Sequence, residues 1–276
     1  MQPIKRVAAI HDLSGYGRCS LSVVYPVLSV MGLQCCALPT AFLSTHTGYD
    51  GFTFHDMTDA LRPAAAHWRA RDFRFDALYS GFLGSVEQIG IVREIFAAFR
   101  RPGTLALVDP VMGDNGRPYR TYTPDMCARM GALADDADII TPNLTEAALL
   151  LDEPWAAAPG DETGVTAWVD RLSRGGTRSV VLTGVTCRPG LIGSAYFDRD
   201  TGGRDILFYP FVGLAYHGTG DLYAAVLLGA LLHGQPLADA VALAGGFVRD
   251  CAALAQQENA SREEGVRYEA LLYRLG

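Results

Sequence analysis

The sequence lacks the features that mark several common classes of protein. No stretch approaches about 18 uninterrupted apolar residues, the length that a transmembrane helix needs. The net charge of −7 leaves no basic excess of the kind that nucleic-acid-binding proteins carry. The N-terminal segment Met1–Arg6 leads into an apolar run that is too short for a secretory signal. These absences predict a cytoplasmic protein that binds neither a membrane nor nucleic acid.

The cysteines carry no disulfide or metal-binding pattern. There are six, and none forms a C-x-x-C pair or clusters with histidine at the spacing of zinc ligands: Cys19, Cys35, Cys36, Cys127, Cys187 and Cys251. We therefore expect buried free thiols, which agrees with a reducing compartment.

Two familiar nucleotide-binding motifs are missing or incomplete. A Walker A loop is absent, so any ATP site must be of another kind. The segment Ser14–Ser20 follows an apolar strand and opens a helix, but it reads G-x-G-x-x-S and lacks the third glycine of a dinucleotide fingerprint. No acidic residue ends the next strand either. An NAD-dependent oxidoreductase therefore remains only a weak alternative.

The apolar pattern alternates between short β-rich runs and longer helical stretches. The expected strands are Arg6–Ile10, Cys35–Leu43, Ala77–Phe82, Leu105–Val111, Asp138–Thr141 and Ser179–Gly184. The expected helices are Ser20–Met31, Asp56–Arg71, Val86–Arg101, Asp125–Ala134, Glu162–Arg174, Leu222–Leu232, Leu237–Gln257 and Glu264–Leu275. This alternation predicts a doubly wound, mostly parallel α/β sheet with helices on both faces.

Two further runs predict an antiparallel edge to that sheet. Gly193–Asp198 and Asp205–Phe211 alternate with a period of two and flank a Gly202-Gly203 turn. No repeat or linker interrupts the chain, so residues 1–276 are expected to form one domain.

Polar residues follow five of the apolar strands, and a parallel sheet brings such positions to one rim. They are Asp12–Gly15, Ser44–Gly48, Asp109–Asp114, Asn143–Glu146 and Thr183-Gly184. His46 and His217 lie on the same rim. For His46, a contact with the substrate and a role in packing both remain open. The convergence predicts a ligand site at this edge.

The segment Gly218-Thr219-Gly220-Asp221 precedes a helix and carries the strongest local signal. Two glycines around a threonine turn backbone N–H groups inward where the helix dipole adds positive charge, which makes an anion cradle. Asp221 is placed to accept a proton from a substrate hydroxyl that attacks phosphorus. The alternative, an acid that only caps its helix, is left open by this segment alone.

Carboxylates at two neighbouring strand ends suit a magnesium ion. Asp109 and Asp114 follow one strand, and Glu146 follows the next. Mg²⁺ is usually held by one or two carboxylates, often through water, together with substrate phosphates. The competing reading is that Glu146 caps its helix and that Asp114–Gly116 is a turn.

Together these motifs resemble the pyridoxal kinases of the ribokinase superfamily. The resemblance rests on Ser44–Tyr49, Asp109–Asp114, Ile140–Ala147 and Gly218–Leu222, which occur in the family's order and extend over nearly the whole chain. It implies a ribokinase-like fold and ATP-dependent phosphorylation of the 5′-hydroxymethyl group of pyridoxal, pyridoxamine or pyridoxine. It also implies a homodimer with a mobile loop over ATP, and leaves the need for a monovalent cation open.

The resemblance implies a role for each matching residue. Asp221 would be the catalytic base, with Gly218, Thr219 and Gly220 as the anion hole for the transferred phosphoryl group. Asp109 and Glu146 would lie near Mg²⁺ and the phosphates, with Thr141 and Asn143 beside them and Thr183 on nucleotide phosphate. The substrate residues would be Thr47 and Gly48, joined by Asp12, Ser14 and His46 from the rim.

Two departures bear on the substrate. Asp12 stands where these kinases usually carry a serine that contacts the substrate ring, and an aspartate there suggests a protonated pyridine nitrogen or an amine as its partner. The Gly15–Ser20 turn differs in length by about one residue.

Hydroxymethylpyrimidine kinases, the nearest relatives, commonly have cysteine where this chain has Asp221, which favours a pyridoxal-like substrate without excluding the pyrimidine. A non-catalytic vitamin-binding protein is disfavoured, because binding alone needs no base at Asp221.

Overall fold

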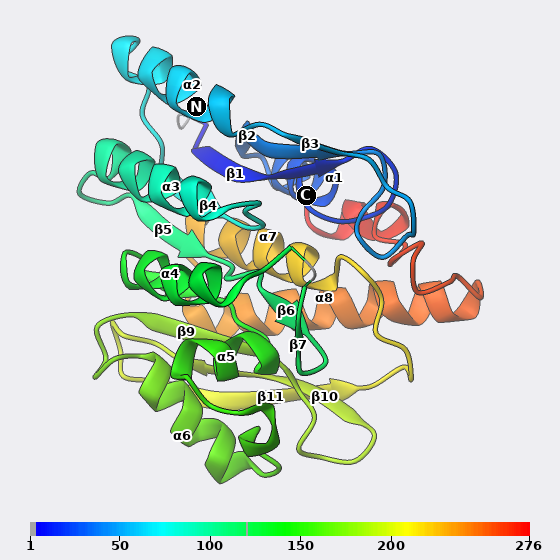
Figure 1. Ribbon diagram of the computed structural model, residues 1–276. Helices are drawn as coiled ribbons and strands as arrows, with labels where there is room; N and C mark the ends of the chain where they lie inside the picture. Colours follow the sequence, from blue (N-terminus) through cyan, green and yellow to red (C-terminus); the bar gives the residue numbers. More distant parts are fainter. Residues whose placement is uncertain (1–3, 120) are drawn as a thin grey trace.

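The computed structural model describes residues 4–119 and 121–276, so the start of the Met1–Arg6 segment and Arg120 lie outside it. Nine strands form one sheet in the order β11-β10-β9-β8-β5-β4-β1-β2-β3. Six neighbouring strands in its middle are parallel: β1 (Arg6–Ser14), β2 (Gln34–Leu43), β4 (Ala77–Ser80), β5 (Leu105–Val108), β8 (Ile139–Ile140) and β9 (Ser179–Val185). The predicted α/β class is confirmed (Figure 1).

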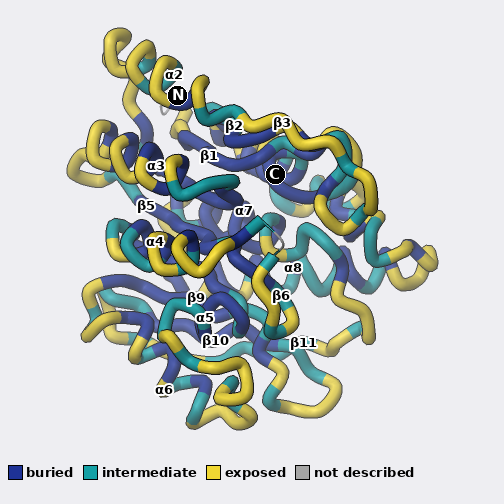
Figure 2. The backbone as a smooth tube through the Cα atoms, in the orientation of Figure 1, coloured by how far each residue is buried: buried dark blue, intermediate teal, exposed yellow. Residues whose placement is uncertain are grey.

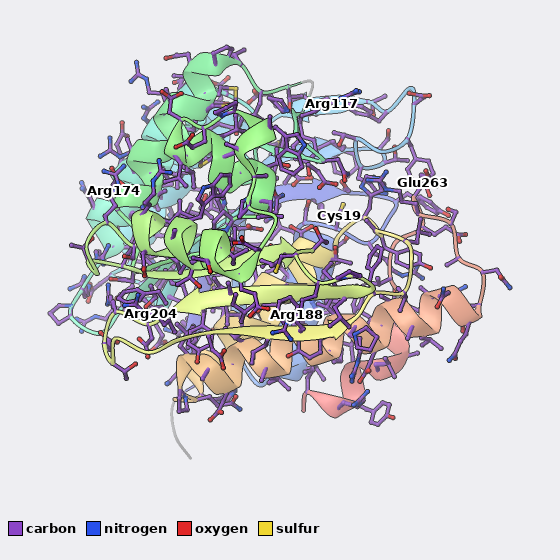
Figure 3. All side chains as sticks on the ribbon, turned by 90° about the horizontal axis from the view of Figure 1, so that it is seen from below. Cys19, Arg117, Arg174, Arg188, Arg204 and Glu263 are labelled. Atoms are coloured by element: carbon purple, nitrogen blue, oxygen red, sulfur yellow. The ribbon has the colours of Figure 1, made fainter. Side chains whose placement is uncertain are left out.

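Antiparallel strands flank the parallel ones on both sides. The predicted edge pair is present as β10 (Leu191–Phe197) and β11 (Arg204–Pro210). Arg188 and Arg204 lie over Phe208 and Phe197 on this pair, where Figure 3 shows both arginines beside the outer strands. The opposite edge, β3 (Phe54–Asp56), was not predicted, because three exposed residues carry no apolar alternation. The described residues also contain a small hairpin, β6 (Gly113–Asp114) with β7 (Arg117–Pro118).

Helices cover both faces of the sheet and enclose two apolar layers. One layer lies against α1 (Leu21–Val30), α7 (Thr219–Leu232), α8 (Leu237–Gln257) and the 3₁₀ helix η2 (Glu269–Arg274). The other lies against α2 (Thr58–Ala70), α3 (Val86–Phe99), α4 (Pro124–Asp135), α5 (Leu144–Leu151) and α6 (Glu162–Leu172). The 3₁₀ helix η1 (Trp155–Ala157) is exposed. Figure 2 shows the central strands buried between these helices.

The strands alternate between these two layers, and this alternation decides where the site residues point. Along β1, Val7 and Ala9 belong to the layer under α7, whereas Ala8 and Ile10 belong to the opposite layer. The next odd position, His11, is therefore directed toward α7. The helix α7 is apolar on nearly all sides and is buried. The residues at its N-terminus are therefore held in place by the packing of the whole helix.

Most predicted elements agree with the structure to within one or two residues at each end. The first strand continues to Ser14, four residues beyond its predicted end at Ile10, and α7 begins at Thr219 rather than Leu222. The strand from Leu105 stops at Val108 rather than Val111, because Pro110 has no N–H to donate to a neighbouring strand. The helix α5 follows the predicted rim segment but was not assigned as an element.

The predicted helix Glu264–Leu275 is wrong. Only Glu269–Arg274 is helical, as a 3₁₀ helix. Gly265 takes a φ of +73° and packs against the carbonyl oxygen of His217, so the chain turns there instead of continuing a helix. Within residues 4–119 and 121–276, no helix is long and apolar enough to cross a membrane.

Candidate active site

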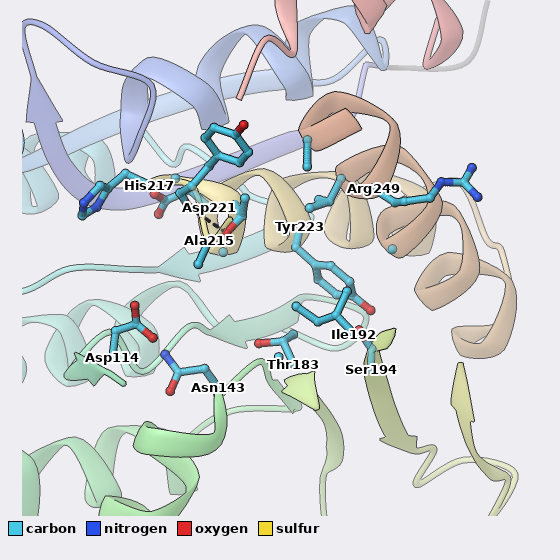
Figure 4. A pocket seen from close by; sticks show the side chains of 18 of the residues that line it. Asp114, Asn143, Thr183, Ile192, Ser194, Ala215, His217, Asp221, Tyr223 and Arg249 are labelled. Atoms are coloured by element: carbon cyan, nitrogen blue, oxygen red, sulfur yellow. Dashed lines mark hydrogen bonds between the residues drawn. The ribbon is translucent and has the colours of Figure 1, made fainter. Parts of the chain in front are cut away.

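Two cavities of unequal size meet at the carboxyl ends of the parallel strands. The larger has a volume of about 390 Å³ and the smaller about 100 Å³. Five residues line both of them: Val111, Tyr119, His217, Gly218 and Asp221. Figure 4 shows Asp221 and His217 at one side of the larger cavity, opposite Asp114, Asn143 and Thr183. Asp221 therefore lies where a ligand in one cavity would face a ligand in the other.

The turn before α7 can be made only by glycine at position 218. Gly218 has a φ of +76°, and a Cβ atom there would lie 1.7 Å from the carbonyl oxygen of Arg18. The helix begins at Thr219, and among the described residues no group accepts a hydrogen bond from the backbone N–H of Thr219, Gly220 or Asp221. Three donors at a helix N-terminus thus face the cavity, as an anion cradle requires.

The carboxylate of Asp221 does not cap its own helix. Its Oδ1 lies 2.8 Å from His11 Nε2, and its Oδ2 accepts a hydrogen bond of 2.8 Å from the backbone N–H of Ser20. Both contacts come from segments some two hundred residues earlier in the chain. Asp221 is therefore not simply a residue that caps its own helix.

His11 is the main residue of the site that the sequence analysis missed. Its ring is buried, and Nδ1 lies 2.8 Å from Asp12 Oδ1 while Nε2 faces Asp221. Burial by itself lowers the pKa of His11, but the charges and hydrogen bonds of Asp221 and Asp12 outweigh burial and raise that pKa to about 10. Nδ1 also lies 2.9 Å from the backbone N of Asp12 and 3.3 Å from that of Phe82, so Nε2 is the ring nitrogen that faces a carboxylate alone.

Asp109 and Glu146 are brought together as buried acids in the wall of the larger cavity. Asp109 accepts a hydrogen bond of 3.0 Å from the Thr141 hydroxyl. Glu146 accepts backbone N–H bonds from Asn143 and Met112, and with Asn143 it forms a capping box at the start of α5. The competing reading of Glu146, as a residue that caps its helix, therefore describes one contact of this carboxylate, and the predicted metal role stays a prediction.

The charges of these two acids are only partly compensated, since the charge of His11 and the hydrogen bond from Thr141 lower the pKa of Asp109 but do not outweigh its burial. Burial, followed by the charge of Asp221, raises the pKa of Asp109 to about 7. Burial and the charge of Asp109 raise the pKa of Glu146 well above its usual range. A divalent cation beside them would relieve this repulsion, so the residues present fit Mg²⁺.

The protein groups alone do not enclose a metal ion. In the described part of the chain, no group of three or more His, Cys, Asp or Glu side chains is placed to hold one. This agrees with the way Mg²⁺ binds in phosphoryl-transfer sites, where one or two carboxylates, water and substrate phosphates complete the shell.

Thr183, the last predicted nucleotide residue, also lines the larger cavity, where it pairs with Asn143 through a β-bridge. The lining also includes apolar residues, among them Ile192, Pro210, Phe211, Val212, Leu214 and Val248. The cavity therefore offers both polar groups and apolar surface, a combination suited to a phosphorylated molecule with a flat ring.

Four of the five predicted substrate residues line the smaller cavity: Asp12, Ser14, His46 and Thr47. The fifth, Gly48, packs behind them, since a Cβ atom there would lie 2.7 Å from His217 Nε2 and 2.8 Å from His46 Cε1.

The ring nitrogens of His46 are both occupied. Nδ1 accepts a hydrogen bond from the Gly48 N–H, and Nε2 donates to the carbonyl oxygen of Glu263. His217 stacks on His46 with ring centroids 4.7 Å apart. Burial, with the charges of His46 and Arg262, lowers the pKa of His217 to about 4, so this ring is neutral near pH 7. His46 thus offers a ligand only the face or edge of its ring.

Arg262 is a second residue that the sequence analysis missed. The chain has a single lysine, Lys5, and it cannot supply a cation to the cavity. It donates to the carbonyl oxygen of Leu232, at the opposite end of α7 from Asp221. Arg262 lines the larger cavity 3.5 Å from Asp114, and its Nε is buried without a hydrogen-bond partner among the described residues. It is therefore a cationic donor available to an anionic ligand.

Comparison with known proteins gives this geometry a family. A model of the phosphomethylpyrimidine kinase family matches residues 27–265. The pyridoxine/pyridoxal/pyridoxamine kinase of Bordetella avium is 30% identical over 247 residues, which cover 85% of this chain and 80% of that protein.

Two solved structures are similar over almost their full length. A Bacteroides thetaiotaomicron protein described as a phosphomethylpyrimidine kinase, in a crystal form with pyridoxal, superposes with a TM-score of 0.94 at 39% identity. The match covers 99% of this chain and 96% of that one. The pyridoxal kinase of Leishmania donovani in complex with ADP and pyridoxamine superposes with a TM-score of 0.86 at 25% identity, covering 98% and 95%. The chain belongs to the phosphomethylpyrimidine kinase family and, with its ribokinase-like fold, groups with the pyridoxal kinases.

Proposed function

We propose that the protein transfers the γ-phosphoryl group of ATP to the 5′-hydroxymethyl group of a B6 vitamer: pyridoxal, pyridoxamine or pyridoxine. The observation that carries this proposal is Asp221 at the border of two cavities, one sized for a nucleotide and one for a small ring. The pyridoxal and the ADP with pyridoxamine in the two related structures support the choice of substrates.

The proposed reaction places each substrate in its own cavity. The vitamer ring would occupy the smaller cavity against Asp12, Ser14 and Thr47, with its hydroxymethyl oxygen toward Asp221. Asp221 would accept the hydroxyl proton as that oxygen attacks the γ-phosphorus and the bond to the β-phosphate oxygen breaks, leaving ADP. The free N–H groups of residues 219–221 would hold the negative charge on the transferred phosphoryl group.

Several residues would support the nucleotide side of the reaction. Asp109 and Glu146 would hold Mg²⁺ through water, with Thr141 and Asn143 fixing their orientation by hydrogen bonds. When bound there, the ion would neutralise charge on the phosphates. Thr183 would contact the phosphates, and Arg262 would add the side-chain cation that the chain's single lysine cannot supply.

Hydroxymethylpyrimidine phosphorylation is the second candidate, because the matching family model is described as phosphomethylpyrimidine kinase and the hydroxymethylpyrimidine/phosphomethylpyrimidine kinase of Rhizobium meliloti is 30% identical over 63% of this chain. The aspartate at position 221 favours the vitamer. The oxidoreductase alternative is weakened by the first turn, whose Ser20 N–H is already bonded to Asp221 and so is not free for a pyrophosphate. A non-catalytic vitamin-binding protein would not need the pairing of the Asp221 carboxylate with an anion cradle.

A coupled ADP-release assay tests the proposed function. With Mg²⁺ and ATP present, we expect turnover with at least one of pyridoxal, pyridoxamine and pyridoxine, and a lower kcat/KM with hydroxymethylpyrimidine. A preference for the pyrimidine would move the assignment to the second candidate. The absence of turnover with every vitamer would refute the vitamer kinase.

Removing the metal should abolish turnover, because two buried acids and the phosphates would then repel each other without a counter-ion. We expect EDTA to stop ADP release and added Mg²⁺ to restore it. Asp109→Asn should raise the Mg²⁺ concentration for half-maximal rate by about 10–100-fold, the range for groups that hold a metal through an outer shell. The exposed Asp125, on α4 away from both cavities, provides the matched control as Asp125→Asn. An unchanged Mg²⁺ requirement in Asp109→Asn would contradict the metal role.

Three further expectations remain proposals. The family resemblance implies a homodimer, which the mass in solution measured by light scattering would check. The pattern of residues 1–276 implies one domain. The cytoplasm is the proposed location, since it supplies ATP and suits six cysteines that are all free.

A further inference from the structure

The imidazole of His11 lies between two carboxylates in the floor of the smaller cavity. It is 1% exposed, and each ring nitrogen has a carboxylate oxygen at 2.8 Å: Asp12 Oδ1 at Nδ1 and Asp221 Oδ1 at Nε2. A buried histidine can be satisfied by a single carbonyl oxygen, so two carboxylate partners are more than burial alone requires. The arrangement therefore calls for a functional explanation.

Two features of the fold make room for this contact. The pairing of β1 with β2 is regular up to His11 opposite Pro39 and then slips, so that Leu13 lies opposite Phe42. Such an irregularity re-aims neighbouring side chains, and here it lets Asp12 reach the ring of the residue before it. Gly81, after β4, leaves the space for the ring, because a Cβ atom there would lie 1.9 Å from His11 Cδ2.

The ring lies among acidic groups from several parts of the fold. The carboxylates of Asp221 and Asp12 raise the pKa of His11, whereas Cys19 and Tyr79 are neutral, because burial and these carboxylates raise the pKa of each. The Nε2–H group of His11 is thus the natural donor to Asp221, while Nδ1 also faces the backbone N–H groups of Asp12 and Phe82.

The contacts join the smaller cavity to Asp221 in one chain of hydrogen bonds. The Ser14 hydroxyl donates to Asp12 Oδ2 at 3.3 Å, and His11 bridges Asp12 to Asp221. The Ser20 N–H holds the second oxygen of Asp221. A carboxylate held at both oxygens by groups from separate elements cannot rotate freely about its Cβ–Cγ bond.

We propose that His11 is a positioning residue, which fixes the Asp221 carboxylate in one orientation between the two cavities and links it through Asp12 to the wall of the smaller one. The proposal rests on the proposed role of Asp221 as the base. It adds that the base is oriented by a residue of the first strand, so that the vitamer pocket and the proton acceptor are mechanically coupled.

Two matched substitutions separate this role from simple packing. His11→Gln keeps an N–H donor at the reach of Nε2 and so can still bond Asp221, whereas His11→Asn places its amide at the reach of Nδ1 and loses that bond. We expect His11→Asn to lower kcat by about 10–100-fold, as a misplaced catalytic group does, with little change in KM for either substrate. His11→Gln should recover most of the rate. Equal rates in the two variants, or a change confined to KM, would overturn the proposal.

A spectroscopic measurement on the unaltered protein covers the case in which the variants do not fold. Long-range ¹H–¹⁵N spectra near neutral pH should show Nε2 of His11 protonated, with that proton strongly deshielded by Asp221. An unprotonated Nε2 would overturn the proposal by itself. The spectrum does not depend on turnover. If the protein phosphorylated no vitamer, the proposed function would be refuted, while the spectrum would still test the contact between His11 and Asp221.

Discussion

Asp221→Asn is expected to lower kcat for vitamer phosphorylation by about 10²–10⁴-fold, the usual scale for the loss of a positioned base. The amide has nearly the shape of the carboxylate, but it cannot accept the hydroxyl proton. ATP binding should be largely preserved, because the anion cradle is made of backbone N–H groups that the substitution leaves in place. Steady-state kinetics together with calorimetric ATP titration would measure both.

The structure adds a second consequence to this substitution. Each carboxylate oxygen of Asp221 has its own donor, from His11 and from the Ser20 backbone, and an amide can satisfy only one of them as an acceptor. The unpaired donor should cost about 1–3 kcal/mol in the free energy of unfolding. Asp125→Asn, the same change in the first turn of another helix, should leave both rate and stability near the unaltered values. Full activity in Asp221→Asn would show that another group is the base.

Gly218→Ala is expected to have the largest effect on structure and rate together. A non-glycine residue at a φ of +76° is strained by about 1–3 kcal/mol, and its Cβ would overlap the Arg18 carbonyl oxygen at 1.7 Å, so backbone must move. Because the same turn sets the start of α7, the donors and Asp221 move with it. A displacement of about 1 Å in a catalytic site costs about 100-fold in rate.

Gly220→Ala provides the control for the stability part of this prediction. No atom lies within 4 Å of a Cβ at position 220, and the residue is already helical. Its free energy of unfolding should therefore stay unchanged or rise by about 1 kcal/mol, as alanine is the better helix former. Denaturant unfolding would compare the two variants. If Gly218→Ala were as stable as Gly220→Ala, the close approach of Arg18 would not be what requires glycine.

Much of the fold could be predicted because the parallel strands are apolar throughout. Runs such as Leu105–Val108 leave few alternatives to a strand covered on both faces, and the Gly202-Gly203 turn identifies the antiparallel pair. The short edge strand Phe54–Asp56 and the turn at Gly265 were out of reach, because both are decided by distant contacts rather than by a local pattern.

The candidate site could be predicted only where a residue follows a recognisable local motif. Asp109, Asn143, Glu146 and Asp221 each end a strand or open a helix, and the sheet carries them to one rim. The roles assigned to them remain predictions, although their places agree with the expectation of a common site.

His11 and Arg262 carry no such motif. His11 is a strand residue whose importance depends on a slip in strand pairing and on a glycine of another strand end. Arg262 lies between the predicted helices Leu237–Gln257 and Glu264–Leu275, in a connection that carries no motif. Its carbonyl oxygen accepts a hydrogen bond from the His217 N–H, and its side chain lines the larger cavity. Contacts that join the first strand and the last segment of the chain to α7 arise only from the tertiary fold.

The shared border of the two cavities has a consequence for inhibitor design. A molecule that joins a pyridine ring to a nucleoside through a chain of phosphates would enter both cavities at once, with its linker passing beside Asp221. Once one end is bound, the other is held at high effective concentration, so the joined molecule should bind more tightly than either part. Because the linker must match the separation of these two pockets, its length would itself become a determinant of selectivity.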